Sequence, residues 1–118
     1  MDKALEGIHI LDMSRVQAGP SCAQMLAFLG ADVVKLEDVT GGDNTRIEMA
    51  HREGVDSVYF TIFNSNKRAI TLDLKTERGK ELFSGLVEWA DIVLENFSKG
   101  VMERLGFGYA ALRQINPR

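Results

Sequence analysis

Residues 7–37 constrain the fold of this chain more than any other part of the sequence. They open with a short apolar run, residues 8–11, whose β-branched side chains are typical of a buried strand. Pro20 is expected at the first position of the next helix, where a missing N–H costs nothing, and Gly30 is expected to end that helix. A second strand is predicted over residues 32–37. This order predicts a right-handed parallel βαβ crossover.

The helix and turn between these strands carry further predictions. Met25, Leu26 and Leu29 fall at helical spacing and are expected to face the core. Cys22 is expected to be a small buried hydrophobic residue on that face rather than a nucleophile. The preceding turn, residues 15–19, lies at the carboxyl end of a parallel strand, where open α/β sheets bind ligands.

The rest of the chain continues the alternation of strands and helices. Strands are predicted over residues 69–73 and 92–94, and helices over residues 76–89, 101–105 and 109–115, with Thr76 as an N-cap and Gly106 as a stop. Residues 38–46 are expected to form a loop, whereas residues 58–63 suit a helix or a strand. The pattern predicts an α/β fold, a Rossmann-like open parallel sheet with flanking helices.

The 118 residues are enough for one domain, residues 1–118, with its own core. The last predicted helix ends where another strand is due, so we expect the amino-terminal fragment of a longer protein, with an incomplete sheet. A net charge of −3 gives no basis for a nucleic-acid partner. One cysteine, no long apolar run and no signal-peptide core predict a cytoplasmic location without a membrane segment.

A dinucleotide site is the first alternative to test. Glu37 ends the second strand where a Rossmann fold places its ribose-binding carboxylate, but the preceding turn has only Gly19 in place of the glycine-rich fingerprint. A solvated charge at the strand end is therefore the expected role of Glu37. His9 and His51 lack partners at ligand spacing, so no metal site is predicted.

Amides, a hydroxyl and cations follow the four predicted strands. They occupy residues 14–17, 37–38, 74–75 and 95–98, and Lys67, Arg68 and Arg104 are close in sequence. Because the carboxyl ends of parallel strands share one edge of the sheet, these groups predict a site for an anionic ligand with amide contacts.

Seven motifs, in a characteristic order and spacing, span essentially the whole chain. They are residues 5–12, 16–20, 30–37, 42–46, 66–68, 72–75 and 95–97. Together they resemble the amino-terminal part of class III CoA-transferases, the CaiB–BaiF family. The segments 16–20 and 59–61 are most similar to the formyl-CoA:oxalate CoA-transferase branch.

The resemblance implies transfer of CoA from an acyl-CoA to a small carboxylic acid through an aspartyl-CoA thioester, with acyl-CoA as substrate and no covalently bound cofactor. The nucleophilic aspartate and the family's small domain would lie beyond Arg118. No catalytic residue is therefore assigned here, and the chain alone is not expected to be active. Full-length relatives form interlocked homodimers, so a homodimer is expected.

The resemblance also assigns CoA contacts, which fall on Gln17, Ala18, Leu72, Asp73, Leu74, Lys75, Asn96, Phe97, Ser98 and Arg104. Lys75 and Arg104 would hold phosphate charge. The backbone near Leu72 and Phe97 would line the adenine, and Gln17 would lie nearest the thioester as an oxyanion donor.

Two positions depart from close relatives. Asp38 stands where an arginine often contacts the nucleotide, and Glu48 stands where the formyl branch can carry a tryptophan. Asp38 would repel a phosphate, and Glu48 would disfavour a dianionic acid. The alternatives are a 2-methylacyl-CoA racemase of the same family, which exchanges an α-proton, and a non-catalytic CoA-binding or assembly module.

Overall fold

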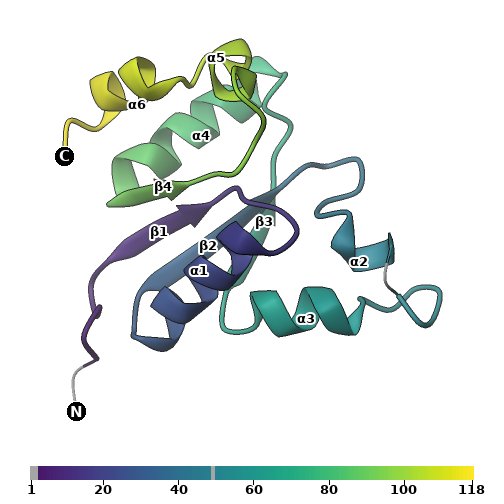
Figure 1. Ribbon diagram of the computed structural model, residues 1–118. Coiled ribbons are helices and arrows are strands. Elements are labelled where there is room, and N and C mark those ends of the chain that lie inside the picture. The colour runs from purple at the N-terminus through teal and green to yellow at the C-terminus, as the bar shows by residue number, and fades with distance from the viewer. Residues whose placement is uncertain (1–2, 49) are drawn as a thin grey trace.

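A computed structural model describes residues 3–48 and 50–118 of the chain. Its centre is a four-stranded, all-parallel sheet in the order β3-β2-β1-β4 (Figure 1). The strands are β1 (His9–Asp12), β2 (Asp32–Glu37), β3 (Arg68–Thr71) and β4 (Ile92–Leu94). This topology confirms the predicted α/β class and the parallel pairing of the first two strands.

Helices cover both faces of the sheet. On one side lie α1 (Ala18–Phe28), α2 (Thr45–Glu48) and α3 (Val58–Asn64), and on the other lie α4 (Glu77–Trp89), α5 (Val101–Leu105) and α6 (Tyr109–Ile115) (Figure 1). Side chains of β1 and β2 alternate between the two layers. Ile10 and Val33 pack with α1, whereas Leu11 and Val34 pack in a second cluster with α4.

Helix α1 departs from its prediction. It begins at Ala18, so Pro20 occupies the third position, still within the first turn, whose N–H groups have no helical partner. The buried side chains are small, Ala23 and Ala27, whereas Met25 is 65% exposed.

The prediction that Met25 and Leu29 face the core is therefore wrong, as is the prediction of a buried Cys22, which is exposed. Small residues face the sheet because the start of α1 packs tightly on the preceding turn. A Cβ on Gly19 would lie 2.2 Å from the Cβ of Ser14.

The ambiguous segment 58–63 is helical, as α3. Ser57 caps it, because its hydroxyl accepts a hydrogen bond from the Phe60 amide at 2.9 Å. The predicted loop at residues 38–46 gives way to α2 at Thr45, where Asp43 accepts bonds from the backbone and hydroxyl of that threonine. The predicted stop at Gly106 is confirmed by its left-handed φ of 88°.

Candidate functional site

Buried ion pairs support the turn between β1 and α1. The Lys67 Nζ donates to Asp12 Oδ2 at 2.8 Å and to the Pro20 carbonyl at 2.8 Å, so it joins the end of β1 to the start of α1. The Lys35 Nζ donates to the Ser14 carbonyl at 2.7 Å and lies 3.1 Å from Asp43 Oδ2. Both lysine ammonium groups are used inside the protein, so neither is presented to a ligand.

The turn itself holds an unusual backbone conformation. Val16 has a φ of 67°, which is uncommon for a β-branched residue and costs about 1–3 kcal/mol. The next residue, Gln17, is exposed at the N-terminus of α1, and its side chain makes no capping hydrogen bond to the helix. The amide of Gln17 is therefore presented to solvent at the carboxyl end of β1, where the sequence places it.

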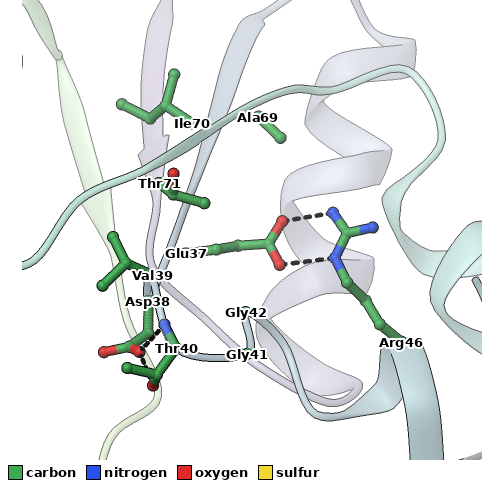
Figure 2. A pocket seen from close by; sticks show the side chains of 10 residues that line it. All are labelled: Glu37, Asp38, Val39, Thr40, Gly41, Gly42, Arg46, Ala69, Ile70 and Thr71. Carbon is green, nitrogen blue, oxygen red and sulfur yellow. Dashed lines mark hydrogen bonds and ion pairs between the residues drawn. The ribbon is translucent and has the colours of Figure 1, made fainter.

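Glu37 is not the solvated carboxylate that the sequence suggests, because it is only 5% exposed. Arg46 donates to its two oxygens at 2.8 and 2.6 Å, as Figure 2 shows, and the Asp43 amide donates at 2.8 Å. Burial raises the pKa of Glu37, but these hydrogen bonds outweigh burial and hold the pKa below its ordinary value. Arg46 also stacks over Phe60, 3.7 Å from the ring centroid.

The hollow in Figure 2 lies along the edge strand β3 and has a volume of about 540 Å³. Its acidic side chains already have partners inside the protein. Glu37 is held by Arg46, and Asp38 Oδ1 accepts hydrogen bonds from the backbone and hydroxyl of Thr40. The Glu37 carboxylate is thus unavailable to a ribose, which removes the structural basis for a dinucleotide site.

A second, smaller cavity of about 70 Å³ gathers the ends of several strands. Segments after β1, β2, β3 and β4 all contribute, so the predicted convergence at one edge is present. Its lining residues are Met13, Arg15, Leu36, Asp38, Leu72, Asp73, Leu74, Lys75, Phe97 and Leu105. The structure therefore brings together five of the predicted CoA contacts, residues 72–75 and Phe97, around a cavity with apolar walls.

Two cations, Arg15 and Lys75, line this cavity together with Asp38. The hydrogen bonds from Thr40 hold the pKa of Asp38 below its ordinary value, and the charges of Arg15 and Lys75 act in the same direction. The Lys75 amide donates to Asp73 Oδ1 at 2.9 Å, which fixes the backbone of this segment. The exposed Lys75 ammonium thus stands beside a turn of defined shape.

The other predicted contacts lie outside the cavity lining. Gln17 and Ala18 are exposed at the start of α1, Ser98 lines a neighbouring hollow, and Arg104 is exposed on α5. The Asn96 side chain binds the backbone of Arg15, accepting from its N–H and donating to its carbonyl, each at 2.8 Å.

Two basic residues near the predicted site serve elsewhere in the fold. Arg68 pairs with Asp32 at 2.6 Å, and both residues begin their strands, so this pair lies at the amino edge of the sheet. Lys67 is buried with Asp12. Proximity in sequence therefore gave the wrong location for Arg68.

Five residues of the cavity are absent from the predicted contacts, namely Met13, Arg15, Leu36, Asp38 and Leu105. Arg15 lies three residues after the end of β1, within the strand-end segment 14–17 that was predicted to contribute to an anion site. Leu105 comes from α5, which only tertiary packing brings to this edge. Across residues 3–48 and 50–118, no group of three or more His, Cys, Asp or Glu side chains has the arrangement of a metal site.

Residues 5–118 match the model of CoA-transferase family III. This chain belongs to that family. Among curated relatives, it is 56% identical over 118 residues to a formyl-CoA:oxalate CoA-transferase of Streptomyces avermitilis. It is 48% identical over 118 residues to one of Rhodopseudomonas palustris. The match covers the whole chain but only 29% and 28% of these relatives, so it spans less than a third of their length.

Solved structures of the same family agree with the fold. A CAIB/BAIF family protein from Brucella suis matches 98% of this chain with a TM-score of 0.89 at 40% identity. A hypothetical protein from Mycobacterium tuberculosis matches with a TM-score of 0.88, also at 40% identity. In each case the match covers 32% of the longer chain. In the described part of the present chain, every helix is too short or too polar to cross a membrane.

Proposed function

We propose that this chain is the CoA-binding, amino-terminal part of an acyl-CoA:carboxylate CoA-transferase that moves CoA from formyl-CoA to oxalate. The cavity at the carboxyl edge of the sheet carries the proposal, since its apolar walls and the adjacent Lys75 suit a nucleotide with phosphate groups. The names of the curated relatives support the substrate pair, and favour transfer over racemisation.

The proposed chemistry proceeds through an aspartate that lies beyond this chain. That carboxylate attacks the thioester, which forms a mixed anhydride and releases the CoA thiolate. The thiolate then attacks the aspartyl carbonyl of the anhydride, which forms an aspartyl-CoA thioester and releases formate. Oxalate attacks this thioester and releases the thiolate again, and the thiolate takes up the oxalyl group and frees the aspartate. Gln17 supports this scheme, because its exposed amide at the N-terminus of α1 can donate to a developing oxyanion. Lys75 and Arg104 would bind phosphate groups.

The proposal includes a cytoplasmic homodimer. The 118 residues contain one cysteine, so no disulfide forms within them, and this suits a reducing compartment. Glu48 is exposed at the end of α2, and its carboxylate accepts a hydrogen bond at 2.8 Å from the side chain of Asn44, just before that helix. This contact supports the tolerance of Glu48 in an enzyme for a dianionic acid.

Calorimetric titration of the 118-residue chain with CoA tests the binding part of the proposal. We expect heat of binding with the wild-type chain, and weaker binding in Lys75→Ala and Arg104→Ala, with a larger loss at low salt because the contacts are ionic. Unchanged affinity in both variants would contradict the assigned phosphate contacts. Absence of binding by the wild-type chain would contradict the proposed function itself.

Activity of the corresponding full-length protein tests the reaction. Incubation of formyl-CoA with oxalate is expected to give oxalyl-CoA. The same assay in deuterated water with a 2-methylacyl-CoA addresses the racemase, which would exchange the α-proton without moving CoA. Proton exchange without transfer would replace the proposed reaction by racemisation.

A further inference from the structure

Arg15 is the one cation of the cavity lining besides Lys75, among the residues that the structure describes. Both polar groups of its backbone, the N–H and the carbonyl, are held by hydrogen bonds. The Asn96 side chain accepts from the Arg15 N–H and donates to the Arg15 carbonyl, each at 2.8 Å. This pair of hydrogen bonds ties the end of β1 to the segment after β4.

The Arg15 side chain is positioned by the next residue of that segment. Its guanidinium carbon lies 5.8 Å from the centroid of the Phe97 ring, within the range of a cation–π contact. Arg15 and Phe97 both line the cavity. A guanidinium held against a ring keeps its charge and its N–H donors for a second partner, and a phosphate is a good partner for that planar group.

Asp38 explains why a second cation is needed here. Its carboxylate lies at the same cavity, and its repulsion would weaken a phosphate contact made by Lys75 alone. Asp73 adds another carboxylate to the lining, although its Oδ1 accepts from the Lys75 amide. With Arg15 included, the lining carries as many cations as carboxylates.

We propose that Arg15 is a CoA-binding residue whose guanidinium, held by Asn96 and Phe97, binds a phosphate group of the CoA nucleotide together with Lys75. This inference rests on the proposed function and adds a contact to it. It also gives Asn96 a role, because the asparagine acts by positioning Arg15. The Asp38 carboxylate makes the cavity less favourable for a phosphate, and the Arg15 guanidinium, which follows the neighbouring strand β1, offsets this charge.

The test is calorimetric titration of the 118-residue chain with CoA, comparing wild type, Arg15→Ala and Arg15→Lys at low and high salt. Loss of a hydrogen-bonded charge predicts about tenfold weaker binding of CoA in Arg15→Ala at low salt, with a smaller loss at high salt. Arg15→Lys is expected to recover part of the affinity, because lysine keeps the charge but lacks the planar donors.

The matched control is Arg68→Ala, which removes an exposed arginine that pairs with Asp32 at the amino edge of the sheet. It is expected to leave CoA affinity unchanged, and circular dichroism is expected to be the same for all variants. If wild type binds CoA and Arg15→Ala binds equally well, this inference is wrong while the proposed function stands. A loss of CoA affinity that is equally large at low and high salt also contradicts a phosphate contact. Absence of CoA binding by wild type rejects both proposals.

Discussion

At the scale of single residues, the most telling feature is charge buried with its partner. The side chains of Lys67 and Asp12 are 1% and 0% exposed, and those of Lys35 and Asp43 are 2% and 0% exposed. Burying a single charge without a partner is strongly unfavourable. Neither residue of a pair can therefore be replaced without leaving the charge of the other buried and unpaired. Because these pairs hold the turn that carries Gln17, they link stability to the position of this proposed oxyanion donor.

Lys67→Met is expected to destabilise the chain by about 3–5 kcal/mol, since it leaves the Asp12 carboxylate buried without its cation. Chemical denaturation followed by circular dichroism measures this change in the free energy of unfolding. The matched control is Arg78→Met, because Arg78 pairs with Glu81 on the surface, at 69% and 68% side-chain exposure. The control is expected to cost less than about 1 kcal/mol, and equal losses would contradict the argument from burial.

Glu37 predicts how the free energy of unfolding depends on pH. Burial raises its pKa, but the hydrogen bonds from Arg46 and the Asp43 amide lower it by more than burial raises it. The folded-state pKa therefore lies below the ordinary value of 4.5. The folded chain thus binds this proton less readily than the unfolded chain. The stabilisation is complete above the ordinary value, and it is lost as the pH falls through the lowered one.

Glu37→Gln is expected to reduce the free energy of unfolding by about 2 kcal/mol near neutral pH, because ionic hydrogen bonds to Arg46 are lost. Its unfolding free energy should also fall less steeply than that of wild type from about pH 5 to about pH 3. Denaturation midpoints across this range measure both effects. Parallel curves for the two proteins would show that Glu37 does not contribute to acid sensitivity.

At the scale of elements, the start of α4 shapes the segment that carries Lys75. A Cβ on Gly79 would lie 1.9 Å from the Asp73 carbonyl oxygen, so only glycine lets the helix approach this closely. The N-cap Thr76 accepts from the Gly79 amide at 3.0 Å and reinforces the contact. The helix thereby fixes the turn over residues 73–75.

Gly79→Ala is expected to destabilise the chain by about 1–3 kcal/mol through overpacking against this backbone. Gly85→Ala, in the same helix with nothing within 4 Å of the added Cβ, is expected to stabilise by about 0.4–1 kcal/mol. Thermal denaturation of both variants separates the two effects. If both substitutions stabilise, the helix is not held against residue 73 as the structure shows.

At the scale of the molecule, the outer surface of α1 is unusually apolar. Met25, Phe28 and Leu29 are 65%, 59% and 51% exposed, and Ile62 of the adjacent α3 is 56% exposed. Exposed apolar patches of this kind often mark interaction surfaces. They agree with the proposed homodimer and with a chain that spans less than a third of its relatives.

The 118-residue chain is therefore expected to self-associate as its concentration rises, because association removes this apolar surface from water. The double substitution Met25→Ser and Phe28→Ser should shift the equilibrium toward monomer, as measured by sedimentation velocity. Leu82→Ser, which changes an exposed leucine of α4 on the other face of the sheet, serves as the control. A wild-type chain that stays monomeric at every concentration would contradict this prediction.

The sequence by itself determined the parallel sheet, the extents of α5 and α6, the N-cap of α4 and the edge at which the strand ends meet. These features follow from local signals: apolar runs, the Thr76 cap and the stop at Gly106. It was also enough to predict that residues 74–75 and Phe97 lie together, because parallel topology alone brings strand ends to one edge.

Only the tertiary structure decided which face of α1 is buried, because close packing at Gly19 favours Ala23 and Ala27 over the larger Met25 and Leu29. It also decided which charged side chains are buried together with a partner. Glu37 is buried because Arg46, nine residues later, folds back onto it, and Lys67 is buried because Asp12 lies beside it. Pairing of distant charges depends on three-dimensional proximity, which local sequence patterns do not encode.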